Sequence, residues 1–592
     1  MTEKKVSFWR IFWPALTAVV LVSVIGWIIT LSVIGGLMGE EPEPKDRTVL
    51  HLTLSGAIGE STDASINSMS FSVDKTTGLS DLLYGFEKAA EDNSVKGIFL
   101  DLNNVSCGYA TAHELRNAIH KFRKSGKFVV AYLSGEVVTQ KQYYISSSAS
   151  EVYGFPTSAM EFMGLGTEST YFKKTLDMIG VEMQVVRGSN NDFKSAVEPF
   201  FRENMSDSSR VQVERFLTSI WQDMRDDIAA DRKITAQLLF DIAENVKIQR
   251  VEDALKYKMI DGCKYRDEVV AIVNKKAGGK VDVTKVLAFE KYARDKFKND
   301  QLKKDGESSG ANIAVVVAEG GISVDGDEMA SRDICRYFRE IRESKKIKTV
   351  VFRINSGGGS ALASEEIWRE VSLTAKKMKV IVSMGDVAAS GGYYIATPAS
   401  TIFAEKTTIT GSIGVFGVIP YTGKLFEEKL GITFDRAQTN AHSVLSTNRK
   451  LTPEEFALVQ AEVDQIYGQF KKRVADGRGM TVEQVDVIAR GRVWTGTDAL
   501  RIGLVDKIGG LSDAIAYAVK QSGIKKPEIK YWPVIDSSPL DDLLEQLSES
   551  ESVKIKSRAQ IPAEFTEAYE KLLKLDEMTG IQMRLPFGLS IR

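Results

Sequence analysis

The 592-residue sequence resembles itself weakly in its two halves, and this internal repeat limits the possible folds more than any other feature. Three segments of the first half return in the second half in the same order. The pairs are LTLSGAIGE (52–60) with VVAEGGISV (316–324), VKGIFLDLNN (95–104) with IKTVVFRINS (347–356), and KFVVAYLSGEVVTQKQYYISSSAS (127–150) with KVIVSMGDVAASGGYYIATPAS (379–400). A shared order of matches indicates duplication of a whole folding unit rather than chance similarity.

Stretches with helical periodicity lie between the repeated apolar runs, for example LSDLLYGFEKAAED (79–92) and EEIWREVSLTAKK (365–377). Strands that alternate with helices predict repeated βαβ units and a mostly parallel sheet. A chain of this length also exceeds what one hydrophobic core usually holds. The sequence therefore predicts an α/β fold with two homologous domains. The predicted parts are an N-terminal segment (1–45), a first domain (46–300), a linker (301–312), a second domain (313–535) and a C-terminal extension (536–592).

No charged residue occurs between Ile11 and Gly39, a stretch long enough for a helix that crosses a bilayer. Three basic residues precede this stretch and two acidic residues follow it, so the positive-inside rule keeps the N-terminus in the cytoplasm. We therefore expect one retained transmembrane helix in the inner (cell) membrane, with both domains on the extracytoplasmic, periplasmic side. A cleaved signal peptide is the alternative, although IGGLMGEEPEP lacks an A-x-A-like cleavage site.

The composition argues against two classes of function. Basic and acidic residues number 77 and 79 and are interspersed, so the net charge of −2 gives no reason to expect binding of nucleic acid. The three cysteines, Cys107, Cys263 and Cys335, are far apart and form no motif with histidine. The sequence therefore predicts neither a disulfide framework nor a metal site, and we expect no cofactor.

Ser390 stands in GDVAASGGYYIATPAS (385–400), where alanines and glycines surround one hydroxyl. An apolar run precedes it and YYIA follows it, which predicts a strand, a tight turn and a helix. The first half has Gln140 at the position that corresponds to Ser390. Conversely, Lys194 in NDFKSAVEPFFREN (191–204) has no lysine counterpart in the second half. Each half has kept one candidate reactive side chain that the other half lacks.

A serine nucleophile needs a base that removes its proton during attack, and lysine is the base in Ser-Lys variants of the catalytic triad. The ordinary lysine pKa near 10.4 leaves only about one amine in a few thousand neutral at pH 7. Burial among apolar groups lowers the pKa of a lysine, and Phe193, Val197 and Phe200 flank Lys194. Among the four histidines, His442 is the alternative base, because it lies near the second-half position that lacks the lysine.

Consecutive glycines in RINSGGGSA (353–361) follow a predicted strand and allow backbone N–H groups to converge on an anion. Together with the N–H of Gly391, this loop predicts an oxyanion hole beside Ser390. A plain glycine turn or a phosphate-binding loop is the alternative, although NSGGGS lacks the GK[ST] ending of a P-loop.

Four motifs together resemble the family of long, two-domain bacterial signal peptide peptidase A, also called protease IV. They are DFKSAVEPF, NSGGGS, DVAASGGYYIA and TTITGSIGVFG (407–417). The resemblance extends from the apolar N-terminal segment to ARGRVWTGTDALRIGLVDKIGG (489–510). It implies a serine endopeptidase of the Clp protease/crotonase-like fold, assembled as a membrane-tethered homotetramer. The implied substrates are cleaved signal peptides and other membrane-associated peptides.

The resemblance also implies roles for five residues. Ser390 corresponds to the nucleophile and Lys194 to the general base of a Ser-Lys dyad. Ser412 corresponds to the serine that forms a hydrogen bond with the lysine amine and orients it. Gly358 and Gly391 correspond to the donors of the oxyanion hole.

The sequence departs from the family pattern at Gly357, where proline is usual, but the exchange removes no donor because proline has no N–H. Two other functions remain open. One is a catalytically inactive membrane scaffold, and the other is a crotonase-type acyl-CoA enzyme that would use the glycine N–H pair to hold an enolate. Peptides and the membrane are the expected partners, without nucleic acid. The terminal GIQMRLPFGLSIR (580–592), apolar with two arginines, carries no assignment.

Overall fold

The computed structural model of this chain describes residues 48–67, 72–279, 287–302, 311–326, 328–533 and 580–585. The predicted transmembrane helix and most of the predicted C-terminal extension lie outside these residues. Among the helices of the described part, none combines the length and the apolar character that a membrane span needs.

The first half forms a seven-stranded sheet in the order β10-β7-β5-β4-β1-β3-β2. Neighbouring strands are parallel except β2 and β3, and apolar runs such as FVVAYL in β5 suit a parallel sheet that is covered on both faces. The strands are β1 (Thr48–Gly59), β2 (Asp63–Asn67), β3 (Ser72–Gly78), β4 (Val95–Ser106), β5 (Phe128–Leu133), β7 (Glu151–Gly154) and β10 (Gly262–Cys263), with a separate pair β6 (Val137–Val138) and β8 (Ala159–Met160). The helices are α2 (Leu79–Glu91), α3 (Tyr109–Lys124), α4 (Gln140–Ser146), α5 (Lys173–Ile179), α6 (Glu198–Phe201), α7 (Asp207–Arg232), α8 (Ala236–Glu244), α9 (Val251–Lys256), α10 (Arg266–Lys276) and α11 (Phe289–Leu302).

The second half repeats this topology. Its sheet has the order β20-β18-β16-β14-β11-β22, with β17 paired to β16 and β21 paired to β17. The strands are β11 (Ile313–Glu319), β14 (Thr349–Ser356), β16 (Lys379–Ala389), β17 (Thr401–Ala404), β18 (Ile409–Gly411), β20 (Val493–Thr495), β21 (Lys507–Ile508) and β22 (Ile529–Trp532). The helices are α12 (Ser331–Glu343), α13 (Ala361–Ala375), α14 (Gly391–Ala396), α15 (Pro453–Arg478), α16 (Val482–Ile488), α17 (Gly496–Arg501) and α18 (Leu511–Ser522). The path β21-β17-β16-β14-β11 matches β10-β7-β5-β4-β1, so the sequence repeat is a structural repeat and the α/β prediction is confirmed.

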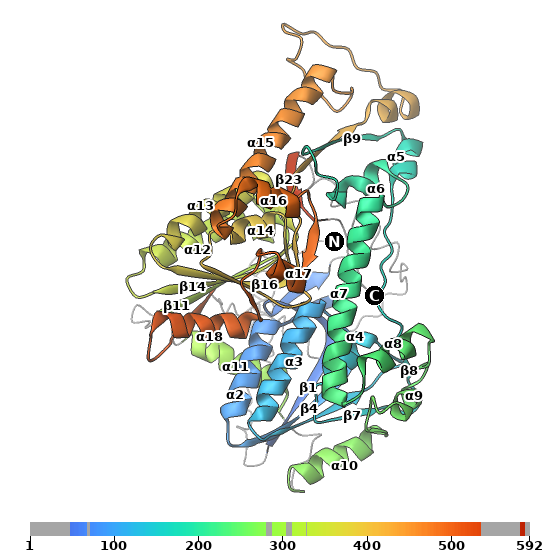
Figure 1. Ribbon diagram of the computed structural model, residues 1–592, viewed down its shortest axis with the longest axis vertical. Helices are drawn as coiled ribbons and strands as arrows, with labels where there is room; N and C mark the ends of the chain where they lie inside the picture. Colours follow the sequence, from blue (N-terminus) through green and yellow to red (C-terminus); the bar gives the residue numbers. More distant parts are fainter. Residues whose placement is uncertain are drawn as a thin grey trace, which may run out of the picture.

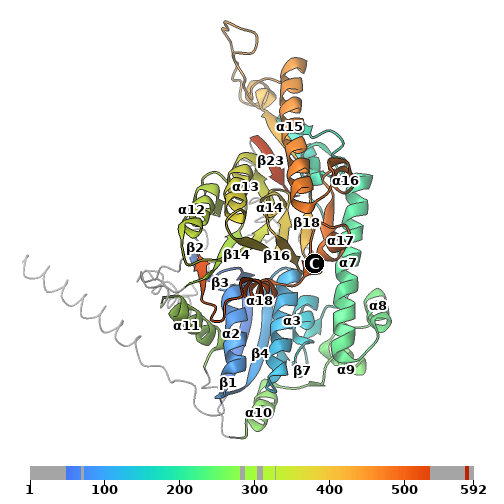
Figure 2. The same ribbon diagram turned by 60° about the vertical axis from the view of Figure 1, so that its left-hand side comes forward.

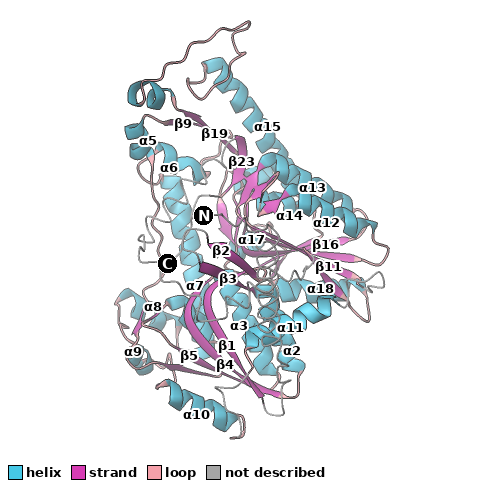
Figure 3. Ribbon diagram, turned by 180° about the vertical axis from the view of Figure 1, so that it is seen from behind, coloured by secondary structure: helices cyan, strands magenta, loops and turns pink. Residues whose placement is uncertain are grey.

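A third sheet joins the two halves in the order β13-β12-β15-β23-β19-β9. Its strands are β9 (Glu182–Arg187), β12 (Ile322–Ser323), β13 (Met329–Ala330), β15 (Gly358–Ser360), β19 (Phe416–Tyr421) and β23 (Gly580–Arg584). First-half strand β9 pairs with second-half strand β19 in antiparallel register, and Figure 3 shows β9, β19 and β23 grouped at one end of the molecule. This pairing places the segment that follows β9 next to the second half.

The two halves also share a hydrophobic core. Helix α18 lies between the second-half strands β14 and β16 and the first-half helices α2 and α3 (Figure 2). Leu511 and Ala514 of α18 belong to the same core cluster as Leu52 of β1, Leu100 of β4 and Val129 of β5. The long helix α7 runs along one side of the molecule and reaches both halves (Figure 1). Apolar packing between the halves therefore helps to set their relative position.

Buried charges cross the same interface. Arg353 on β14 is fully buried, and its guanidinium donates to Glu60 Oε2 at 2.8 Å and to Glu114 Oε1 at 2.7 Å, both in the first half. Burial raises the pKa of Glu114 to about 7, although the nearby Arg353 opposes that shift. Because unpaired buried charges are costly, this triad favours one docking arrangement of the two halves.

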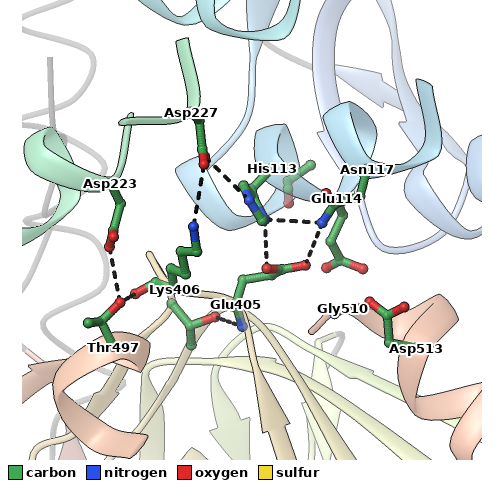
Figure 4. A network of polar contacts seen from close by, with 12 residues as sticks. His113, Glu114, Asn117, Asp223, Asp227, Glu405, Lys406, Thr497, Gly510 and Asp513 are labelled. Atoms are coloured by element: carbon green, nitrogen blue, oxygen red, sulfur yellow. Dashed lines mark hydrogen bonds and ion pairs between the residues drawn. The ribbon is translucent and has the colours of Figure 1, made fainter. Parts of the chain in front are cut away.

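His113 of α3 belongs to a second polar network across the interface (Figure 4). Its Nδ1 lies 2.7 Å from Glu405 Oε2, and its Nε2 lies 3.4 Å from Asp227 Oδ2 on α7. Burial alone would lower the pKa of His113, but the carboxylates of Glu405 and Asp227 raise it to about 10. His113 is thus a cationic link between the halves at neutral pH.

Candidate active site

Ser390 occupies the turn between β16, which ends at Ala389, and α14, which begins at Gly391, as the strand-turn-helix prediction expected. Its φ of +56° lies in a region that residues other than glycine rarely adopt. The Ser390 N–H donates to the Gly411 carbonyl at 2.8 Å, and the Ser390 carbonyl accepts the Tyr394 N–H at 2.8 Å. These two hydrogen bonds hold the turn in place. Strained backbone of this kind is common at functional sites.

The small residues after Ser390 allow close approach of the chain's own glycine loop. A Cβ added to Gly391 would lie 2.7 Å from Ser364 Oγ, and one added to Gly392 would lie 2.6 Å from the Ser356 carbonyl oxygen. The contact at Gly392 is with backbone and leaves no room for a side chain, whereas at Gly391 a side chain would require Ser364 to shift and would press against the Gly358 backbone at 3.1 Å. Gly391 and Gly392 therefore lie close to the backbone of Gly358 and Ser356, respectively.

Lys194 reaches Ser390 from the other half of the molecule, 196 positions earlier in the chain. Its Nζ lies 2.7 Å from Ser390 Oγ, 3.0 Å from Ser412 Oγ and 3.0 Å from the Ser412 carbonyl oxygen. All three side chains are fully buried. The structure thus brings together the three residues that the resemblance assigned to nucleophile, base and orienting group.

Second-half backbone holds the loop that carries Lys194. The Phe193 N–H donates to the Arg490 carbonyl at 3.0 Å, and the Asn191 side-chain amide donates to the Val415 carbonyl at 3.2 Å. Gly491 lies directly against Lys194, because a Cβ at Gly491 would approach Lys194 Cβ to 2.6 Å. The position of the lysine therefore depends on the docking of the two halves.

Burial holds the pKa of Lys194 well below its ordinary range. The three oxygens around Nζ come from hydroxyl and carbonyl groups, which carry no charge that would stabilise the ammonium form. Ala196, Val197 and Phe200, which follow Lys194 in the chain, belong to a buried apolar cluster that also contains Phe416 of the second half. A neutral amine at physiological pH is the state that a general base needs.

Ser412 lies just beyond β18 in a left-handed conformation with φ of +50°. Its N–H donates to the Arg492 carbonyl at 2.7 Å, which anchors this residue to the segment before β20. Both its hydroxyl and its carbonyl face Lys194 Nζ. A neutral amine that donates its two N–H groups to these oxygens leaves its lone pair for the Ser390 hydroxyl.

The two candidate oxyanion donors lie beside the nucleophile. Gly391 is the first residue of α14, where a backbone N–H has no acceptor within the helix. Gly358 has φ of +94°, and its N–H donates to Ser356 Oγ at 3.1 Å. A Cβ on Gly391 would lie 3.1 Å from Gly358 Cα, so the two glycines are in contact. An oxyanion bound here would take the Gly358 N–H from Ser356.

The alternative base is not part of this group. His442 is about half exposed, and its Nδ1 lies 3.2 Å from Glu455 Oε1 at the start of α15. Its contacts are those of a surface histidine. In the described ranges, no set of three or more histidine, cysteine, aspartate or glutamate side chains is arranged to hold a metal ion.

The sequence analysis missed Gln212 on α7, which supports the lysine loop from behind. Its side-chain amide nitrogen lies 3.0 Å from both the Phe193 carbonyl oxygen and Ser195 Oγ, and its Oε1 accepts the Val493 N–H at 3.2 Å. Gln212 thus connects the residues on either side of Lys194 with β20 of the second half. No motif in the sequence distinguishes Gln212 from the other polar residues of α7.

Comparisons with known proteins find sequences similar to most of this chain. The family model described as Peptidase family S49 matches residues 121–280 and 372–525. "Protease 4" of Salmonella typhi is 35% identical over 471 residues, which cover 77% of this chain and 74% of that protein. "Serine protease SPPA, chloroplastic" of Arabidopsis thaliana is 32% identical over 489 residues, which cover 81% of this chain and 69% of that protein.

Among solved structures, a point mutant of ClpP1 from Listeria monocytogenes matches at 15% sequence identity. The match covers 37% of this chain and 98% of that chain, with a TM-score of 0.25.

Proposed function

This chain belongs to peptidase family S49 and is a serine peptidase, and we propose that it is an endopeptidase in which Ser390 attacks the peptide bond and Lys194 is the general base. One observation supports this assignment above all others. The Lys194 amine and the Ser390 hydroxyl, from different halves of the chain, are 2.7 Å apart in a fully buried site.

In the acylation step, the Ser390 hydroxyl gives its proton to Lys194 Nζ while Ser390 Oγ forms a bond with the substrate carbonyl carbon. The carbonyl oxygen takes the negative charge and accepts hydrogen bonds from the N–H groups of Gly358 and Gly391. One such donor contributes roughly 3–4 kcal/mol to transition-state stabilisation in serine peptidases. The tetrahedral intermediate then breaks its C–N bond, and Lys194 returns the proton to the leaving amine.

In the deacylation step, water replaces the released amine. Lys194 Nζ takes a proton from this water, whose oxygen attacks the ester carbonyl of the acyl-enzyme. Collapse of the second tetrahedral intermediate breaks the bond to Ser390 Oγ, which recovers its proton from Lys194. The products are a carboxylic acid and the free enzyme, and no cofactor enters the balance.

We further propose that the enzyme is anchored in the inner membrane, assembles as a homotetramer and degrades signal peptide remnants and other membrane-associated peptides. The uncharged stretch from Ile11 to Gly39 supports the anchor, and the motif resemblance supports the substrates and the assembly. A reporter fused after Arg592 should respond as a periplasmic domain. Protease added to spheroplasts should digest the chain beyond about residue 45. A cytoplasmic reporter response contradicts this topology.

A fluorophosphonate probe tests the catalytic assignment directly. The probe should label the wild-type protein at Ser390 and leave the Ser390→Ala and Lys194→Met variants unlabelled. Ser146→Ala is the matched control, because Ser146 is also a fully buried serine but lies in α4 of the first half. An unlabelled wild-type protein that folds normally would instead favour the inactive scaffold or the acyl-CoA enzyme.

A further inference from the structure

The strand that leads into Ser390 is bound, four residues before the nucleophile, by a helix of the other half. We propose that the first-half helix α3 holds the nucleophile in its reactive position, with Asp386 and Thr111 as the positioning pair. This inference rests on the proposed peptidase function and goes beyond it, because it assigns a role in the reaction to residues outside the catalytic group.

Strand β16 has a bulge shortly before the nucleophile. Met384 and Ala388 of β16 pair with residues that are only two positions apart in β14, so residues 385–387 stand opposite a single residue. A bulge bends its strand, and bulges are frequent next to active sites, where they change the direction of a side chain. Beyond residue 386 the strand also pairs with β18, and it ends directly before Ser390.

Asp386, in the middle of this bulge, binds the N-terminus of α3. Its Oδ1 accepts the Thr111 N–H at 2.8 Å, and its Oδ2 accepts the Thr111 hydroxyl at 2.6 Å. Gly108 is the N-cap residue of α3 and has no side chain that could cap the helix, and a Cβ at Gly108 would collide with the Asp386 carboxyl group. A carboxylate in this place is stabilised by the free N–H groups and by the helix dipole. Asp386 of the second half therefore caps a helix of the first half.

The same helix reaches the bulge by a second route. His113 Nδ1 lies 2.7 Å from Glu405 Oε2 (Figure 4). The Glu405 N–H donates to Thr408 Oγ1 at 3.0 Å, and the Thr408 hydroxyl donates to the Gly385 carbonyl at 2.8 Å. Helix α3 is thus connected to Gly385 through three side chains and to Asp386 directly. Two adjacent residues of the bulge depend on the position of the first half.

The turn that follows the bulge needs such support. Ser390 has a φ of +56°, and a strained conformation persists only where the surrounding structure determines it from several sides. The hydrogen bond from the Ser390 N–H to the Gly411 carbonyl holds the turn itself, whereas Asp386 holds the strand before it. A displacement of about 1 Å can lower a rate about 100-fold. Release of Asp386 from α3 should therefore move Ser390 Oγ out of line with Lys194 Nζ.

Replacement of Asp386 by alanine removes both hydrogen bonds to Thr111. In the full-length protein, Asp386→Ala should lower kcat for a short peptide at least tenfold and leave KM within twofold of the wild type. Asp386→Asn should restore kcat to within threefold of the wild type, because asparagine caps helices as well as aspartate does. A kcat of Asp386→Ala within twofold of the wild type overturns the proposal. A kcat of Asp386→Asn as low as that of Asp386→Ala also overturns it.

The rate of labelling by a fluorophosphonate probe separates positioning from folding, because the probe reports the reactivity of Ser390 without a bound peptide. Below the melting temperature of each variant, the labelling rate of Asp386→Ala should fall in proportion to kcat. A purely structural role predicts a lower melting temperature with an unchanged labelling rate. Asp92→Ala is the matched control and should keep the wild-type rate. Asp92 also accepts a backbone N–H and a hydroxyl, both from Ser94, at 2.9 and 2.6 Å, but within the first half alone.

A milder variant perturbs the contact from the other half. Thr111→Val removes only the hydroxyl of a buried side chain and keeps its shape, so it tests the proposal even if Asp386→Ala does not fold. It should lower kcat two- to fivefold, and an unchanged kcat overturns the role of the pair. Combination with Asp386→Ala should add little, because both changes remove the same contact, whereas multiplied losses contradict the pairing. A wild-type protein that neither hydrolyses peptides nor labels at Ser390 overturns the peptidase function itself.

Discussion

Replacement of Ser412 by alanine tests how the lysine amine is aimed at the nucleophile. Lys194 Nζ is surrounded by Ser390 Oγ at 2.7 Å and by two oxygens of Ser412 at 3.0 Å. In Ser412→Ala the carbonyl remains as an acceptor for one N–H, whereas the other N–H loses its partner. Rotation about the Cε–Nζ bond can then direct an N–H instead of the lone pair toward Ser390.

The expected loss follows from one missing hydrogen bond. A typical net contribution of about 0.5–1.5 kcal/mol corresponds to a kcat that is about 2- to 13-fold lower, since roughly 1.4 kcal/mol is a factor of ten in rate. Lys194→Met removes the base itself and should lower kcat by several orders of magnitude. The kcat of Ser412→Ala should therefore be clearly higher than the kcat of Lys194→Met.

Steady-state hydrolysis of a short fluorogenic peptide, followed from pH 7 to about 10.5, supplies kcat and KM for each variant. Ser146→Ala is again the control, because its hydroxyl donates to the Tyr143 carbonyl at 3.0 Å and its loss should leave kcat unchanged. An unchanged kcat in Ser412→Ala refutes the orienting role. A loss as complete as that of Lys194→Met also refutes it, because Ser412 would then be indispensable in its own right.

Three further outcomes are expected. Ser390→Ala and Lys194→Arg should each abolish hydrolysis and should cost little more in combination, because the pair acts as one unit and a guanidinium stays charged; additive losses contradict this. In the wild-type enzyme kcat/KM should rise about tenfold per pH unit and level off well below pH 10.4, because only the neutral Lys194 accepts a proton and burial lowers its pKa. A rise of kcat/KM that levels off only near pH 10.4 excludes a buried base. Arg353→Met should lower the free energy of unfolding by about 3–5 kcal/mol, because two buried carboxylates lose their partner, and an unchanged melting temperature in thermal unfolding contradicts the structural role of this triad.

Patterns along the chain were sufficient to predict the elements around the site. The apolar run before Ser390 and the small residues after it predicted β16, the turn and α14, since strand and helix periodicity are local properties. The comparison of the two halves indicated Ser390 and Lys194 as candidate reactive residues, because neither has a counterpart of its own type in the other half. The flanking apolar residues also indicated the correct direction of the Lys194 pKa shift.

Other features depend on contacts between distant parts of the chain, and only the tertiary structure decided them. The support that Gln212 gives to the lysine loop depends on the position of α7 next to β20. The sequence of residues 580–585 has no pattern that predicts a strand or a site, yet these residues join the third sheet. The distance of 2.7 Å between Lys194 and Ser390 follows from the docking of two halves through a shared core and buried charges. Sequence periodicity reports which face of an element is apolar, but the partner of that face is chosen by the packing of the whole molecule.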